Sequence, residues 1–112
     1  MKFHPFLEQR LEQLADLCTK HSVSRLYAFG SIVSGNFDEA TSDIDLQVVL
    51  LPIDDPIEKG TILLELWDAL EKLFERKVDL LTDQPIKNPF FSKSVEETKI
   101  LVYDRASREV LV

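Results

Sequence analysis

The sequence predicts an α/β (α+β) domain with two layers, in which a sheet of about four strands is covered by helices. The first observation behind this prediction is the order of segments: helix, strand, short helix, strand, helix, strand, helix, strand. The second is the length of 112 residues, for which we expect one compact domain, residues 1–112, without a separate substrate-binding domain. The third is an apolar content of 45%, enough for a buried core.

The amino-terminal segment predicts one helix followed by one strand. Pro5 suits a first helical turn. The apolar residues after it recur at helical spacings of four, three and four: Leu7, Leu11, Leu14 and Cys18. This pattern predicts an amphipathic helix of about four turns. Residues 26–29 then form a short apolar run that ends at Gly30, which is typical of a buried strand entering a tight turn.

The middle of the chain predicts a polar loop, a second strand and a long helix. Residues 31–42 are mostly polar, with room for a short helix, and residues 43–51 are rich in branched apolar side chains, as strands are. Asp55, Pro56 and Glu58 then form a helix-start signal, with an N-cap, a proline at the first helical position and an acidic residue at the third. The leucines that follow lie along one stripe of the predicted helix.

The last part predicts a strand over residues 77–82, a short helix, and a final strand over residues 100–103. The short helix carries Phe90 and Phe91, which we interpret as core or partner-contact residues. For Trp67, in the long helix, we expect a place in the core.

Charge and composition narrow the function. The formal net charge of −7 disfavours a broad nucleic-acid surface, because such surfaces neutralise phosphates with Lys and Arg, so we expect no long nucleic acid as a direct partner. No apolar run approaches the roughly 20 residues of a membrane helix and no secretory signal pattern is visible, so we expect a cytoplasmic protein without a membrane partner. The single cysteine, Cys18, cannot form an internal disulfide and is expected in the core.

Two aspartates in the second predicted strand are the first candidate site residues. Asp43 and Asp45 are separated by one residue, so the strand period places both carboxylates on the same face. Like charges this close repel one another unless a cation or hydrogen-bond donors compensate. Magnesium is a natural candidate, because it binds oxygen ligands and keeps positions for water and phosphate.

Asp79 adds a third acid, also inside an apolar strand where a charge is costly. Three acids on neighbouring strands could hold two metal ions, and such sites activate an attacking oxygen and stabilise a leaving one. The structural alternative is that these three aspartates are solvated charges on an edge strand, which sheets use against aggregation.

Gly30 and Ser31 lie where the first strand gives way to the short helix. The glycine allows close backbone approach, and the helix start offers amide groups to phosphate, to which Ser31 can add its hydroxyl. Serine is also an ordinary N-cap, so the pair is informative mainly because a strand-borne Asp-x-Asp follows twelve residues later.

These segments resemble a known family. YAFGSIVSG, SDIDLQVV and KVDLLT are similar to the minimal nucleotidyltransferases (MNT) of the DNA-polymerase-beta-like superfamily over residues 25–82, and the tail VEETKILVYD is similar too. The resemblance implies a nucleotidyltransferase fold with a mixed sheet. It also implies nucleotide binding at Gly30 and Ser31. It further implies three residues that bind two Mg²⁺ ions and catalyse the reaction, with ATP as the substrate: Asp43, Asp45 and Asp79.

The resemblance also implies a partner. Similar proteins of this size are antitoxins of HEPN ribonuclease toxins in toxin-antitoxin pairs, and some transfer AMP from ATP to a tyrosine of the toxin (AMPylation). We therefore expect an AMP-transferring antitoxin, which pairs with its HEPN toxin and could also form homo- or hetero-oligomers. Two alternatives remain open: a non-catalytic antitoxin that binds and masks the toxin, and a transferase that modifies a small molecule.

The chain departs from its relatives at Ser34, where many of them have arginine. No basic residue lies between Arg25 and Lys59. The loop between Ser31 and Asp43 is also one residue longer than is usual for the family. Neutralisation of phosphate is therefore expected from magnesium, from Arg76 or Lys77, or from a partner.

Overall fold

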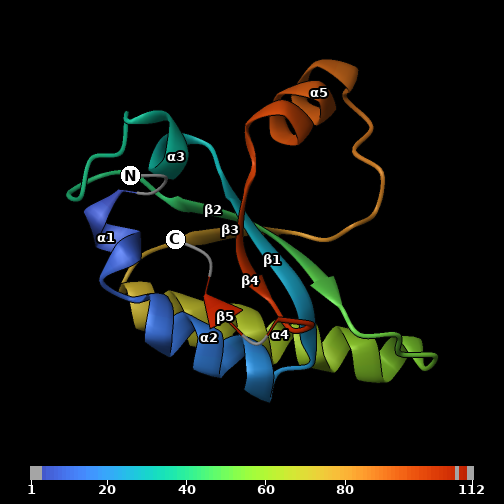
Figure 1. The fold of residues 1–112 in the computed structure, drawn as a ribbon. Helices are drawn as coiled ribbons and strands as arrows, with labels where there is room; N and C mark the ends of the chain where they lie inside the picture. Colours follow the sequence, from blue (N-terminus) through green and yellow to red (C-terminus); the bar gives the residue numbers. More distant parts are fainter. Residues whose placement is uncertain (1–3, 108, 111–112) are drawn as a thin grey trace.

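A five-stranded mixed sheet forms the centre of the molecule in the computed structural model, which describes residues 4–107 and 109–110. The strands are β1 (Val23–Phe29), β2 (Ile44–Leu50), β3 (Val78–Leu81), β4 (Ile100–Asp104) and β5 (Glu109–Val110). Their order across the sheet is β3-β2-β1-β4-β5, with β2 and β3 parallel and every other neighbouring pair antiparallel (Figure 1). The predicted fold class is confirmed, and β5 is a short strand that the sequence pattern did not predict.

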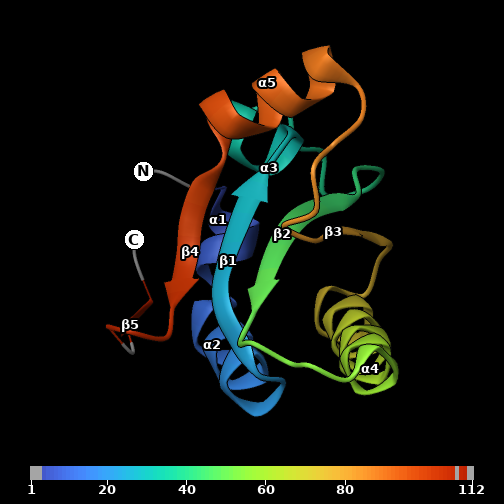
Figure 2. The same cartoon turned by 90° about the vertical axis from the view of Figure 1, so that its right-hand side faces the viewer.

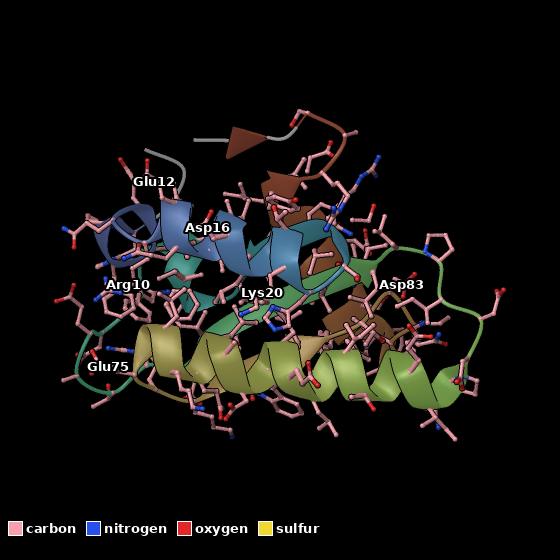
Figure 3. All side chains as sticks on the ribbon, turned by 90° about the horizontal axis from the view of Figure 1, so that it is seen from below. Arg10, Glu12, Asp16, Lys20, Glu75 and Asp83 are labelled. Carbon is pink, nitrogen blue, oxygen red and sulfur yellow. The ribbon has the colours of Figure 1, made fainter. Side chains whose placement is uncertain are left out.

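Helices cover one face of this sheet and one end of the other. The helices are α1 (Pro5–Glu8), α2 (Leu11–Lys20), α3 (Ser31–Ser34), α4 (Pro56–Phe74) and α5 (Pro89–Thr98). Helices α2 and α4 run side by side across one face, with α1 continuing the layer (Figure 3). Helices α3 and α5 lie at the end of the sheet where β1 finishes (Figure 2).

The core fills the space between the sheet and the α2–α4 layer. Its fully buried side chains come from both layers, with Leu14 and Cys18 from α2, Leu66 and Leu70 from α4, and alternate residues such as Leu46 from the strands. The alternation within the strands leaves the intervening side chains on the opposite face, which we call the open face of the sheet. Burial raises the pKa of the Cys18 thiol to about 12, so Cys18 is a neutral core residue, as expected.

The amino-terminal helix differs from its prediction, because the expected single helix is broken between Glu8 and Leu11. The Arg10 guanidinium donates a hydrogen bond of 2.8 Å to the Phe6 carbonyl oxygen, the acceptor that the Arg10 amide would use in a continuous helix. The Arg10 amide bonds instead to the Leu7 carbonyl oxygen at 3.0 Å. The same guanidinium stacks 3.8 Å from the centre of the Phe6 ring, so a side-chain interaction replaces one turn of backbone bonding.

Helix α4 begins as predicted and holds the edge strand β3 in place. The Asp55 carboxylate caps the helix by accepting a bond of 2.9 Å from the Ile57 amide. Near the other end, Glu71 accepts a bond from the Val78 amide (3.0 Å), and the Trp67 indole donates one to the Val78 carbonyl oxygen (2.7 Å). Two side chains one turn apart therefore satisfy the amide and carbonyl of Val78 at the outer edge of β3.

No helix among the described residues is long and apolar enough to span a membrane.

Candidate functional site

The open face of the sheet carries a row of three side chains at the end where β1 finishes. Phe29 of β1 is paired with Asp45 of β2, and Asp45 is paired with Asp79 of β3. Neighbouring Ala28 and Ile44 are fully buried in the core, so the strand period turns the row away from the helical layer. Side chains directly opposite one another lie about 5 Å apart at Cβ, so the two carboxylates meet although their strands are far apart in sequence.

The electrostatics of this pair are unfavourable without a compensating cation. The pKa of Asp45 is raised to about 6, first by burial, then by a hydrogen bond and repulsion from Asp79, and last by the charge of Asp43. The half-buried Asp45 is therefore harder to ionise than an ordinary aspartate. A positive ion between the two carboxylates would relieve this cost.

Asp43 lies at the edge of the site rather than in it. It comes one residue before β2, beyond the last β2–β3 pair (Ile44 with Val78), and is not among the residues that line the adjacent cavity. Within residues 4–107 and 109–110, no group of three or more His, Cys, Asp or Glu side chains forms a ready metal-ligand set. Of the three predicted aspartates, Asp45 and Asp79 are paired across β2 and β3, and Asp43 is close enough for its charge to raise the pKa of Asp45.

The carboxylate pair nevertheless suits magnesium. Mg²⁺ binds hard oxygen ligands and in nucleotide sites typically takes one or two carboxylates, completing its coordination with phosphate and water. Asp45 and Asp79 supply that number of carboxylates at a solvent-accessible cavity. The donor set therefore fits a magnesium ion bound together with a nucleotide.

Gly30 brings the backbone directly against this pair. A Cβ atom added to Gly30 would overlap Oδ2 of Asp45, and Gly30 has φ +73° and ψ −148°, values that L side chains rarely adopt. Gly30 is also the N-cap of α3, and its carbonyl oxygen accepts bonds of 3.1 Å from the amides of Val33 and Ser34. Helix α3, with its first backbone amides at Ser31 and Ile32, therefore begins immediately beside the Asp45 carboxylate.

The basic residues near β3 have different roles. Lys77 Nζ lies 3.8 Å from Asp79 Oδ1, with the lysine side chain 67% exposed, so this ion pair is weak and solvent-screened. The Arg76 guanidinium points instead to the loop before β2, where it donates bonds to the carbonyl oxygens of Ser42 (2.9 Å) and Glu39 (2.6 Å). Of the two cations expected at the phosphates, only Lys77 is close to the carboxylate pair.

Arg76 also stacks on the aromatic cluster beneath that loop. Its guanidinium carbon lies 4.3 Å from the centre of the Phe6 ring and 5.1 Å from that of Phe37, and the two rings lie 5.4 Å apart. The segment that ends at Asp43 is thereby fixed to α1 and α4 through one side chain.

A cavity of about 920 Å³ opens beside the row of carboxylates. Its lining comes from the ends of β1, β2 and β3 and from α3, α4 and α5: Phe29, Gly30, Ser31, Val33, Ser34, Asn36, Asp45, Trp67, Asp79, Leu80, Leu81, Phe91, Ser94 and Thr98. Four of the five predicted site residues, all but Asp43, are in this set. The volume is in the range of small-molecule sites.

Two aromatic residues of the lining were missed from the sequence. Trp67 was expected in the core, but it is 39% exposed, because its indole reaches over the edge of β3. Phe91 is 44% exposed and faces Phe29 with ring centres 6.1 Å apart. A signal was available for Phe91: consecutive residues Phe90 and Phe91 cannot share one face of a helix, so at least one had to lie near solvent.

A carboxylate pair beside a glycine at a helix start, on the wall of a cavity of this size, defines a candidate enzyme of nucleotide chemistry. The nucleotidyltransferase domain family model matches residues 11–102. The chain belongs to this family and is a nucleotidyltransferase.

Relatives and solved structures agree with this assignment. The chain is 39% identical over 87 residues to a Methanocaldococcus jannaschii protein named "Putative protein adenylyltransferase MJ0126". The aligned residues cover 78% of this chain and 84% of the relative. A solved structure described as a putative minimal nucleotidyltransferase is 26% identical, with a TM-score of 0.58, covering 84% of this chain and 90% of that one. The resemblance to minimal nucleotidyltransferases is thus confirmed.

One further solved structure shares the fold. It is a complex of a tri-AMPylated HEPN toxin from Shewanella oneidensis with an MNT antitoxin. The matched chain is 19% identical with a TM-score of 0.53, covering 89% of this chain and 74% of that one.

Proposed function

We propose that this protein is a magnesium-dependent antitoxin that transfers AMP from ATP to a tyrosine of a cognate HEPN toxin. The observation that carries the proposal is the Asp45–Asp79 pair, set against Gly30 on the wall of a nucleotide-sized cavity. The relative named as a protein adenylyltransferase supports the reaction, and the complex of an AMPylated HEPN toxin with an MNT antitoxin supports the partner.

In this reaction the phenolic oxygen of the tyrosine forms a bond to the α-phosphorus of ATP. The bond from that phosphorus to the bridging oxygen breaks, and pyrophosphate leaves. Asp45 and Asp79, joined by Asp43, would hold magnesium, which when bound supplies positive charge to the phosphates. The Asp79 side chain is 48% exposed, so it is open to an incoming hydroxyl group and would accept its proton.

Gly30 and Ser31 would receive the phosphates from the other side. The start of α3 presents backbone amides there, and the Ser31 hydroxyl adds a donor. Because Gly30 has no side chain, the Asp45 carboxylate can lie directly against the helix start that would receive the phosphates. These contacts need no lysine or arginine, in keeping with the absence of either from the residues that line the cavity in the described structure.

The charge of the chain supports a protein partner that binds RNA. A net charge of −7 complements the basic surface that a ribonuclease presents to its substrate. Complementary charge increases the rate of association and favours the correct partner, both for an antitoxin that transfers AMP and for one that masks the toxin. A cytoplasmic location follows from the proposed partner and its RNA substrate.

Intact mass spectrometry tests the proposal. The chain is purified with the protein encoded beside it and incubated with Mg²⁺ and ATP, and each polypeptide is weighed for added AMP. We expect adducts on the partner that disappear in the Asp43→Asn, Asp45→Asn variant. The matched control is Asp83→Asn, which removes an exposed carboxylate outside the cavity and should retain transfer.

The two alternatives predict different results in this assay. If the partner is inhibited in the complex but never gains AMP, the chain is a masking antitoxin. If AMP appears only on an added small molecule, the chain is a small-molecule transferase. Either result contradicts the proposed function.

A further inference from the structure

We infer that Phe91 is the residue on which the nucleobase stacks, so that α5 forms the base subsite of the cavity. The inference rests on the proposed function, because it assigns one end of the same cavity. It adds a substrate contact in a helix that contains none of the residues predicted from the sequence motifs. Four observations carry it.

The first observation is that Phe91 is held in place although it is half-exposed. The Asn88 side chain caps α5 by accepting bonds from the amides of Phe90 (3.0 Å) and Phe91 (3.2 Å), and Pro89 occupies the first helical position. One turn further on, Val95 is 1% exposed and anchors the helix. A base that stacks on a ring fixed in this way orders few additional groups of the protein, so the entropic cost of binding is small.

The second observation is the orientation of the Phe91 ring. Its centre lies 6.1 Å from that of Phe29 and the two planes make an angle of 67°, so the contact is edge-on. Phe29 is 5% exposed, whereas Phe91 is 44% exposed, and both line the cavity. In an edge-on contact the edge of one ring meets its partner, so the faces of the Phe91 ring are not covered by stacking on Phe29.

The third observation is that this aromatic pair lies next to the carboxylates. Phe29 is the direct cross-strand partner of Asp45 on the open face, so the apolar end of the cavity begins one strand away from the proposed metal site. A nucleotide has the same polarity, with phosphates at one end and a flat aromatic base at the other. With its phosphates beside Asp45 and the start of α3, its base is directed along the cavity wall.

The fourth observation is the composition of the α5 face. Phe91, Ser94 and Thr98 follow one another at spacings of three and four, so they form a single stripe, and all three line the cavity. A stripe that served only for core packing would be apolar at each position. An aromatic ring beside the Ser94 hydroxyl suits a base, which needs a stacking surface and hydrogen-bond partners, while the Thr98 hydroxyl donates to the Ser94 carbonyl oxygen (2.6 Å) and is left as an acceptor.

The competing explanation is that the exposed aromatic residues of α5 contact the partner protein. Phe90 distinguishes the two, because it is adjacent in sequence and 85% exposed but does not line the cavity. A docking surface would use the more exposed Phe90 at least as much as Phe91. A base subsite would use Phe91 and not Phe90.

The test is isothermal titration of the purified chain with ATP and with inorganic tripolyphosphate, both in excess Mg²⁺. The variants are Phe91→Leu, which removes the ring but keeps an apolar side chain, Phe91→Tyr, which keeps the ring, and the control Phe90→Leu. We expect Phe91→Leu to weaken ATP binding roughly tenfold, within the range measured for loss of one base-stacking aromatic residue. Tripolyphosphate binding should be unchanged, and Phe91→Tyr and Phe90→Leu should bind ATP like the parent.

Four results overturn the inference. ATP affinity could be unchanged in Phe91→Leu, or tripolyphosphate affinity could fall in parallel with it, which would indicate a general disturbance of the cavity. Phe90→Leu and Phe91→Leu could also weaken partner binding equally while leaving ATP binding intact, as a docking surface requires. Failure of the parent chain to bind either ligand overturns the nucleotide site itself, and with it both this inference and the proposed function.

Discussion

The carboxylate of Asp45 occupies the space in which a side chain at Gly30 would begin. An added Cβ at Gly30 would overlap Asp45 Oδ2, and Asp45 is at the same time the residue paired with Asp79 across β2 and β3. The turn after β1 and the acid pair are therefore fitted to one another. A substitution in the turn acts on the acids directly.

Gly30→Ala should abolish nucleotide transfer. Its cost has two parts: backbone strain at φ +73°, about 1 kcal/mol or more, and displacement of Asp45. Gly35→Ala is the matched control, because Gly35 also has positive φ (+89°) but an added Cβ meets nothing within 4 Å. Urea unfolding should show destabilisation in both variants, larger for Gly30→Ala because it also displaces Asp45, and the mass-spectrometric assay should show loss of transfer only for Gly30→Ala. Full transfer by Gly30→Ala would show that the Asp45 contact is not needed.

The raised pKa of Asp45 predicts that stability falls as pH rises. The folded-state pKa of about 6 exceeds the ordinary value of 3.8, so between these values the folded state holds more protons than the unfolded state. The free energy of unfolding without metal should therefore decrease from pH 4 to pH 6, by about 1 kcal/mol once solvent screening of this half-exposed group is considered. Denaturation curves across this range measure the slope.

Asp45→Asn provides the control for that pH dependence. The substitution removes the ionising group and its repulsion with Asp79, so the variant should lack this part of the slope and be more stable than the parent at pH 7 without magnesium. The parent should be stabilised by added Mg²⁺ and the variant much less so. A variant with the same slope and the same response to magnesium would contradict the assignment.

Much of the fold follows from short-range patterns in the sequence. The apolar runs of β1 and β2, the Asp55-Pro56 start of α4 and the glycine after β1 each have a local cause, and each was predicted, although β1 begins three residues before the predicted run. The acid pair was predictable in part. Asp45 and Asp79 share a row because they are strand residues paired directly across β2 and β3. Asp43 lies beyond the strand pairing, and no local pattern indicates where pairing ends.

The remaining site features depend on contacts between distant segments. Trp67 looks like a core residue in α4, and only the position of β3 beside the helix gives its indole a carbonyl partner and brings it to the cavity. Arg76 looks like a phosphate ligand, but two carbonyl oxygens from residues more than thirty positions earlier hold it. The break before Leu11 likewise arises from Arg10 bonding to the Phe6 carbonyl oxygen, which helical periodicity does not reveal.

Arg76→Ala should loosen the loop before Asp43. The side chain donates to the carbonyl oxygens of Ser42 and Glu39 and stacks on Phe6, so its loss should lower the free energy of unfolding by about 2–3 kcal/mol. Hydrogen exchange should increase over residues 37–42. Arg25→Ala, at an exposed position of β1, is the control and should change neither measurement much. If exchange in the loop is unaffected, the two hydrogen bonds do not hold it.

Ser34→Arg should increase the affinity for nucleotide. Ser34 is exposed in α3 and lines the cavity, whose described lining includes two carboxylates and no basic residue. An arginine there would meet phosphate at the cost of one long hydrogen bond (3.5 Å) from the Ser34 hydroxyl to the Ser31 carbonyl oxygen. One charge-assisted contact predicts a gain of roughly tenfold in ATP affinity by titration calorimetry, decreasing with added salt. Ala40→Arg adds the same charge on an exposed residue outside the cavity and should give little gain. Equal gains in both variants would assign the effect to net charge alone, and no gain at Ser34 would place the phosphates away from α3.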